Sequence, residues 1–135
     1  MRIKLLYLTC ALCLLAPAMA SASTLEYSYA QISSANSTVD LVATTSGSGT
    51  LHGVKCIFPS NDSGAEVKIT TTLDGTGSSF TIDPTNLERE ASGAGQFLTG
   101  WIPIGNNFTT SIHVTLNNTN LGTATINCWA SWFLN

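Results

Sequence analysis

Residues 66–73 read EVKITTTL, and apolar and polar side chains alternate along this stretch with a period of two. Residues 108–116, FTTSIHVTL, alternate in the same way, with Phe108 and Ile112 on one face and His113 on the other. A period of two is the signature of a β-strand that buries one face and exposes the other. The sequence therefore predicts a half-buried strand in each stretch.

Weaker strand patterns lie on both sides of these two stretches, and the abundance of Thr along the chain favours the same conformation. These further predicted strands are residues 25–32, 38–44, 51–58, 79–83, 96–104 and 123–133. Clusters of Gly, Asn, Asp, Ser and Pro favour turns between them, at residues 46–49, 59–64, 74–77, 105–107 and 117–120. A short helical turn is predicted at residues 84–91, with Asp83 as its cap.

About eight short strands spaced roughly 8 to 12 residues apart are typical of an antiparallel β-sandwich. The predicted fold class is therefore all-β, and a jelly roll is one sandwich arrangement that fits this spacing. A chain of 135 residues suits one folded domain.

Residues 1–22 have the three-part pattern of a secretory signal peptide. Arg2 and Lys4 form a positive start, and an apolar run of 12 residues follows at 5–16. Small residues then allow cleavage after Ala20 or, as we expect, after Ala22. The mature chain would be one extracytoplasmic domain, residues 23–135, that is secreted, held at the cell surface or kept in the periplasm. No later segment has the roughly 18 apolar residues of a transmembrane helix.

The mature chain is acidic and poor in charge. Charged residues make up 10% of the sequence, against about 25% in an ordinary soluble protein. Removal of Arg2 and Lys4 leaves three basic residues against eight acidic ones, a net charge of −5. This charge disfavours nucleic acid as a partner.

Two of the four cysteines lie in the leader, and the mature chain keeps Cys56 and Cys128. In an oxidising compartment an even pair predicts one disulfide. The two cysteines have no CxxC spacing, so they do not indicate a metal site. A bridge between residues 72 positions apart would close most of the domain and join the strand near Cys56 to the last strand.

Catalytic patterns are weak. His52 shares its alternation face with Cys56, His113 lies on the polar face of its strand, and no metal-ligand spacing links the two histidines. Glu88 and Glu90 are the densest acidic pair and would suit a hydrolase if they faced a substrate, but we expect them to lie on a solvated surface turn. We expect no enzymatic activity, no cofactor and no metal ion.

Aromatic residues form the candidate binding site: most gather toward the end of the chain, and Tyr27 and Tyr29 share a face of the first predicted strand. Trp129 and Trp132 are three positions apart, so in a regular strand they face opposite sides. If Trp132 points inward with Cys128, Trp129 and Phe133 point outward. The sequence leaves open whether these rings are exposed or covered by a second layer. The candidate binding aromatics are Trp101, Trp129, Phe133, Tyr27 and Tyr29.

These features favour a non-enzymatic exported β-sandwich that acts by surface binding, as a cell-surface or filament subunit or an adhesin-like module. Its partners would be other protein subunits, including copies of itself, and the last strand could lie at a sheet edge and add to another subunit. The alternative is a small carbohydrate-binding, lectin-like domain in which an exposed Trp stacks on a glycan. A small hydrolase is the third alternative.

Overall fold

The computed structural model describes residues 23–58, 66–82, 97–119 and 125–135. Within these ranges the chain forms nine strands and no helix. The strands are β1 (Thr24–Ile32), β2 (Thr38–Ser46), β3 (Gly49–Phe58), β4 (Val67–Leu73), β5 (Thr76–Ile82), β6 (Phe97–Leu98), β7 (Ile102–Phe108), β8 (Ser111–Asn118) and β9 (Ile126–Leu134). The predicted leader, and the predicted helical turn with Glu88 and Glu90, lie outside the described residues.

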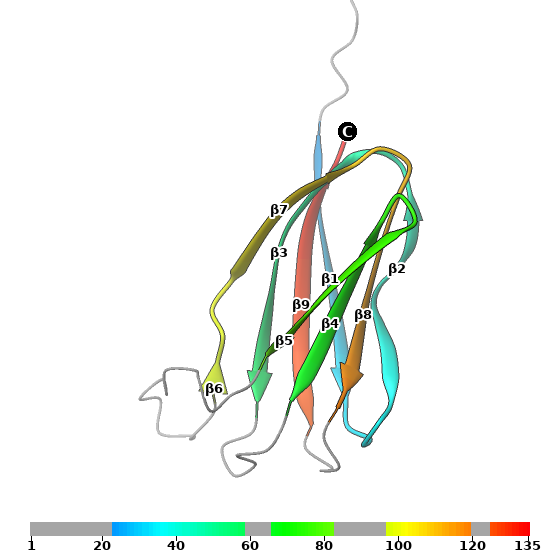
Figure 1. The fold of residues 1–135 in the computed structure, drawn as a ribbon. Helices are drawn as coiled ribbons and strands as arrows, with labels where there is room; N and C mark the ends of the chain where they lie inside the picture. The colour runs from blue at the N-terminus through cyan, green and yellow to red at the C-terminus, as the bar shows by residue number, and fades with distance from the viewer. Residues whose placement is uncertain (1–22, 59–65, 83–96, 120–124) are drawn as a thin grey trace, which may run out of the picture.

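The strands form two antiparallel sheets that pack face to face (Figure 1). Sheet A has the order β1-β9-β3, and both β6 and β7 pair with the far side of β3; sheet B has the order β2-β8-β4-β5. Because β6 and β7 are two parts of one edge strand, interrupted at residues 99–101, each sheet has four strands. The prediction of an all-β sandwich with eight strands is confirmed.

The pairing is nested, and this defines the type of sandwich. The first strand pairs with the last, β2 with β8, β3 with β7, and β4 with β5, as in one long hairpin of the whole chain. The hairpin is then rolled up, since β9 also pairs with β3 and β8 with β4. This arrangement is a jelly roll, one of the forms that the strand spacing allowed.

Side chains from the inner faces of both sheets fill the space between them, because alternate residues of each strand point inward. Cys56 and Cys128 lie opposite each other on β3 and β9, with a Cα–Cα distance of 4.2 Å, and form the predicted disulfide. Both cysteines are fully buried. Around them lie Ile32, Leu51, Val54, Phe58, Ile126, Ala130 and Trp132 from sheet A and Leu41, Val42, Val67, Ile69, Ile112, Val114 and Leu116 from sheet B.

The predicted strand at residues 108–116 is wrong in one respect, since the structure divides it between two strands. Phe108 ends β7 in sheet A, the chain turns at residues 109–110, and β8 begins in sheet B. Phe108 and Ile112 are both buried. The apolar alternation therefore continues across the turn, and it does not reveal that the chain changes sheets.

Asp74 holds this crossing in place. The β4–β5 hairpin turns at Asp74 and Gly75, both with positive φ (52° and 79°), as the tight hairpin turn between Leu73 and Thr76 requires. The Asp74 carboxylate accepts hydrogen bonds from three consecutive backbone N–H groups, those of Thr109 (2.9 Å), Thr110 (2.7 Å) and Ser111 (3.1 Å). The N–H groups of Thr110 and Thr109 lower the pKa of Asp74 far below its ordinary value.

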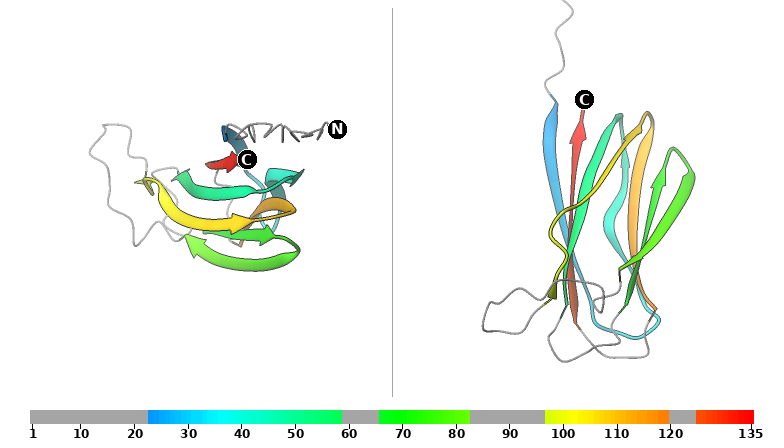
Figure 2. Two further views of the ribbon diagram at one scale, coloured as in Figure 1. Left: turned by 90° about the horizontal axis from the view of Figure 1, so that it is seen from above. Right: turned by 60° about the vertical axis from the view of Figure 1, so that its left-hand side comes forward.

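Two further expectations are corrected by sheet A. Residues 105–107, expected as a turn, belong to β7, and Gly105, with a φ of 66°, lies where the register with β3 shifts. The last strand, β9, does not form an edge, because it lies between β1 and β3. The edge is β1, as the right-hand view of Figure 2 shows. Ser23 and Asn135 lie side by side at one end of the sandwich, where their side chains hydrogen-bond at 2.9 Å.

Candidate binding surface

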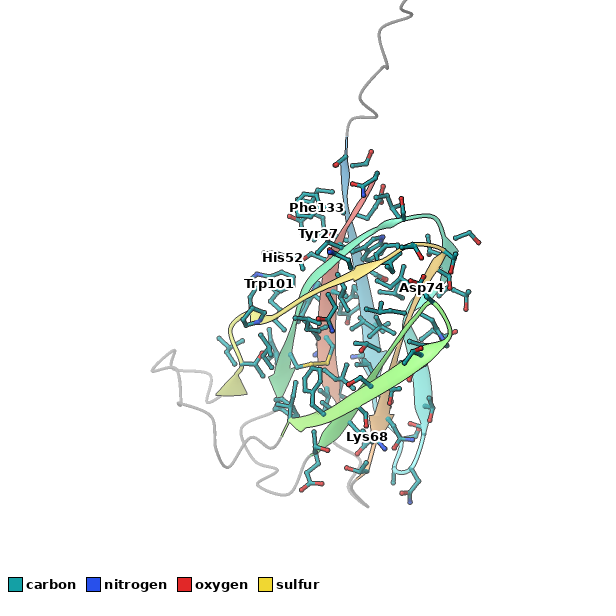
Figure 3. The ribbon with its side chains drawn as sticks, turned by 45° about the horizontal axis from the view of Figure 1, so that its top comes forward. Tyr27, His52, Lys68, Asp74, Trp101 and Phe133 are labelled. Carbon is teal, nitrogen blue, oxygen red and sulfur yellow. A yellow bond between two sulfur atoms is a disulfide. The ribbon has the colours of Figure 1, made fainter. Side chains whose placement is uncertain are left out.

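The outer face of sheet A carries all the large apolar side chains that are exposed in the described part of the chain. They are Leu25 (41% exposed), Tyr27 (63%), Tyr29 (53%), Trp101 (41%) and Phe133 (36%). The alternation of each strand explains this placement, because neighbouring residues such as Ile32, Ile102 and Trp132 point into or toward the core. Figure 3 shows Tyr27, Trp101 and Phe133 on the same side of the molecule.

A lysine side chain lies between two tryptophan rings of this face. The ammonium group of Lys55 on β3 is 5.1 Å from the ring centre of Trp129 and 5.2 Å from that of Trp101. Such distances allow cation–π attraction to both rings. Trp129 also packs against Tyr29 with ring centres 5.2 Å apart, and the Tyr29 hydroxyl donates a hydrogen bond to Oδ1 of Asn127 at 2.7 Å. The contacts therefore run without a break from β1 across β9 and β3 to Trp101.

His52 extends this surface toward Phe133. Its ring centre is 6.3 Å from the rings of both Trp101 and Phe133, and its Nδ1 lies 3.1 Å from the hydroxyl of Ser131. His52 is exposed, although the alternation of β3 predicted that it would share the inner face with Cys56. The cause is a β-bulge, where the register with β9 shifts between the two neighbours of His52 and turns its side chain outward.

We call this surface the aromatic face. It consists of Tyr27, Tyr29, His52, Lys55, Trp101, Trp129 and Phe133. The structure places on this face all five aromatics that the sequence singled out, and Trp129 is half-buried while the other four are exposed. Trp132 is buried, as the alternation of inward and outward residues along β9 required. Sequence reasoning missed Lys55 and His52. The signal for His52 was Gly53, since a glycine inside a strand often marks a bulge.

The aromatic face carries a cation and no carboxylate. The acidic residues in the described part of the chain are Glu26, Asp40, Glu66 and Asp74. None of them takes an outward position on sheet A: Glu26 alternates with Tyr27 on β1, and the other three lie on or next to strands of sheet B. The charge of this face thus differs in sign from that of the whole chain.

The remaining polar groups show no comparable cluster. His113 on β8 lies 2.9 Å from Asp40 on β2, on the outer face of sheet B and away from the aromatic face. Within the described residues, no group of three or more His, Cys, Asp or Glu side chains is arranged to hold a metal ion. The same residues include no helix long and apolar enough to cross a membrane.

An open hollow of about 260 Å³ lies near the Asp74 hairpin. Its lining is mostly hydroxyl and amide groups, from Thr71, Leu73, Thr76, Ser78, Asn106 and Asn107. It contains no titratable side chain and is separate from the aromatic face.

Comparison with solved structures gives a weak likeness in fold. The chain is similar to a chain of the acidic stable capsid structure of Helicobacter pylori bacteriophage KHP30, with 11% sequence identity and a TM-score of 0.49, over 83% of this chain and 91% of that chain. No protein-family model matches the sequence, and no curated protein matches it. A likeness of this size carries no inference about function, so the proposals below depend on the residues of this chain.

Proposed function

We propose that this protein is a non-enzymatic, exported β-sandwich that acts by surface binding, as a subunit of a cell-surface assembly or an adhesin-like module. The observation that carries the proposal is the position of the large apolar side chains that are exposed in the described residues, all of which lie on one face of sheet A. Single exposed apolar residues are ordinary, but several gathered on one face mark an interaction site. The contact surface is therefore the aromatic face.

The composition of the aromatic face suits a protein partner. Tyr, Trp and Phe are enriched in protein interfaces, and a few such side chains supply most of the binding energy when they fill pockets on the partner. The rings are held by neighbours on a rigid sheet, since Lys55 lies between Trp101 and Trp129 and Tyr29 packs on Trp129. Little side-chain freedom is then lost on binding.

The test compares assembly of the wild-type protein with that of variants of the aromatic face. The full chain is expressed with its own N-terminal segment, purified from the extracytoplasmic fraction, and analysed by light scattering and negative-stain microscopy. Trp101→Ala and Phe133→Ala should each weaken association or attachment to the producing cells by tenfold or more. Lys68→Ala, at an exposed position of β4 in sheet B, is the control. Unchanged assembly and attachment in a folded Trp101→Ala/Phe133→Ala double variant would refute the proposal.

A second candidate is a lectin-like glycan-binding function. It is favoured by the mixture of flat rings and hydrogen-bonding groups on one surface, where Asn127 and His52 lie beside Trp129 and Trp101. An indole ring can stack on the apolar face of a sugar while such groups bind its hydroxyls. Lys55 would further favour a glycan that carries a carboxylate.

Tryptophan fluorescence tests this candidate. The protein is titrated with a neutral β-glucan and with polygalacturonate, and binding should shift the emission of the wild-type protein more with the charged polymer. The shift should be lost in Trp101→Ala and reduced in Lys55→Gln. If neither polymer changes the emission, binding of these two classes of glycan is excluded.

A further inference from the structure

The free edge of β1 is the second feature of sheet A that has no function in the fold. β1 pairs with β9 over nine consecutive residues without a register shift, and within the described residues no strand pairs with its other side. A long, regular edge strand exposes unpaired N–H and C=O groups to any strand that can add to it. Native proteins usually protect such an edge.

The other edge of sheet A has this protection. The β6–β7 edge is interrupted at residues 99–101, contains Pro103, and shifts its register with β3 near Gly105. In sheet B, the edge strand β2 has two register shifts against β8, and the other edge strand, β5, is regular but has seven residues against the nine of β1. β1 has no proline, no lysine and no bulge, and Glu26 is its single charge. It is the edge best suited to pairing.

Hydrogen bonds on the far side of β9 show which backbone groups of β1 are free. In an antiparallel strand, the N–H and C=O of one residue point to one neighbour and those of the next residue to the other. The N–H of Asn135 donates to the C=O of Ser48 beside β3 (3.0 Å), so the odd-numbered residues of β9 face β3 and the even-numbered residues face β1. The C=O of Cys56 accepts from the N–H of Thr99 (3.1 Å), away from β9, which gives the same assignment.

Even-numbered residues of β1 lie opposite even-numbered residues of β9, as in the pair Ser28 and Ala130. Their backbone groups are therefore used within sheet A. The odd-numbered residues Leu25, Tyr27, Tyr29 and Gln31 direct their N–H and C=O groups to the open edge. Three of these four side chains belong to the exposed apolar set on the outer face.

We propose that β1 pairs with β1 of a second copy of this chain, antiparallel and centred on Ser28. Ser28 is the midpoint of β1, so this register uses the full length of both strands. Tyr27 then lies opposite Tyr29 of the partner subunit, and the rings meet on the outer face as a cross-strand aromatic pair. Glu26 lies opposite Ala30 of the partner subunit, so no like charges face each other.

This inference rests on the proposed function, because it names the partner in assembly and describes what pairing does to the aromatic face. Sheet A becomes one continuous sheet through both subunits, and the two aromatic faces join at their tyrosines. A dimer would offer two copies of the Trp101–Lys55–Trp129 cluster on one surface, which strengthens attachment to a repetitive target through multivalency.

Cysteine crosslinking tests the register. In the proposed dimer, Ser28 faces Ser28 of the partner subunit in a pair without ladder hydrogen bonds, where Cα atoms are about 4.5 Å apart, within the range of a disulfide. Ser28→Cys should give a covalent dimer under mild oxidation, with the Cys56–Cys128 bridge intact. Glu26→Cys, the matched control two residues away on the same face, should not. Failure of Ser28→Cys to crosslink, or equal crosslinking of both variants, would overturn the register.

A proline at the free edge tests the pairing without a crosslink. The N–H of Tyr27 makes no bond within sheet A, so Tyr27→Pro should fold, while it removes two donors from each dimer. Tyr27→Thr is the matched control, since it also lacks the ring but keeps the N–H. Sedimentation velocity should show a dimer dissociation constant at least about tenfold higher for the Pro variant than for the Thr variant.

The same samples separate this inference from the proposed function. Equal association of the Pro and Thr variants would overturn edge pairing, while loss of attachment in Trp101→Ala would still support the aromatic face as the binding surface. A Trp101→Ala protein that crosslinks through Ser28→Cys but no longer attaches would support both proposals. Attachment without any dependence on Trp101 and Phe133 would refute the proposed function and leave the crosslinking result to decide the pairing.

Discussion

Reduction of the Cys56–Cys128 disulfide should cost the domain a large share of its stability. The bridge joins residues 72 positions apart, and the chain-entropy relation for a loop of this length gives about 4 kcal/mol at 25 °C. The free energy of unfolding of an ordinary domain is about 5 to 15 kcal/mol, so loss of the bridge would remove roughly a quarter to four-fifths of it. For a chain of this size, we expect a fall in Tm of roughly 15 °C.

The measurement is urea unfolding of three samples, followed by far-UV circular dichroism: the oxidised protein, the reduced protein, and a Cys56→Ala/Cys128→Ala variant. The reduced protein keeps both buried sulfur atoms, so its difference from the oxidised protein isolates the crosslink. The variant also loses these atoms from the core and should be slightly less stable still. A difference below about 1 kcal/mol between oxidised and reduced protein would refute the loop-entropy reasoning, because it would show that the bridge scarcely restricts the unfolded chain.

Three further predictions concern stability. Gly49→Ala should lower the free energy of unfolding in urea by about 3 kcal/mol, because a Cβ at this position would overlap the carbonyl oxygen of Phe133. Wild-type stability of this variant would contradict the close approach. Ile112→Ala, at a fully buried core position, should lower the free energy of unfolding by about 2 to 5 kcal/mol. Leu25→Ala, at an exposed position, should lower it by roughly 0.5 kcal/mol or less, and equal losses in the two variants would contradict the burial assignment. The pKa of Asp74 is lowered in the folded state, so the unfolded chain takes up the proton at a higher pH than the folded one. The contribution of Asp74 to stability is therefore complete at neutral pH and should decline as the pH falls below about 4. The urea midpoint of an Asp74→Asn variant should depend less on acid pH, and identical pH profiles of variant and wild type would refute the role of the carboxylate.

The sequence predicted those parts of the fold that depend on local alternation. Strands such as β1 and β4 follow their period-two patterns closely, and the parity of β9 correctly separated Trp132 in the core from Phe133 on the surface. The disulfide followed from the count of cysteines outside the predicted leader. Each of these conclusions needs only the order of residues within one strand or the number of residues of one type.

What the sequence did not predict depends on contacts between distant segments. The bulge that exposes His52 is a mismatch in length between β3 and its partner strands, and within β3 itself Gly53 is its one sequence signal. The turn after Phe108 is fixed by Asp74, which lies more than thirty residues earlier in the chain. The position of β9 inside sheet A likewise depends on pairing with two strands from the first half of the chain.

The central position of β9 in sheet A also determines when the protein can fold. Thr24 at the start of β1 pairs with Leu134 at the end of β9, and β3 reaches β1 only through β9. During synthesis, β1 and β3 therefore cannot be joined in one sheet until β9 has been made. The disulfide cannot form earlier either, because Cys128 lies on β9. Such long-range pairing makes folding slow. For the exported protein proposed above, sheet A and its disulfide would form only after Cys128 has reached the oxidising side of the membrane.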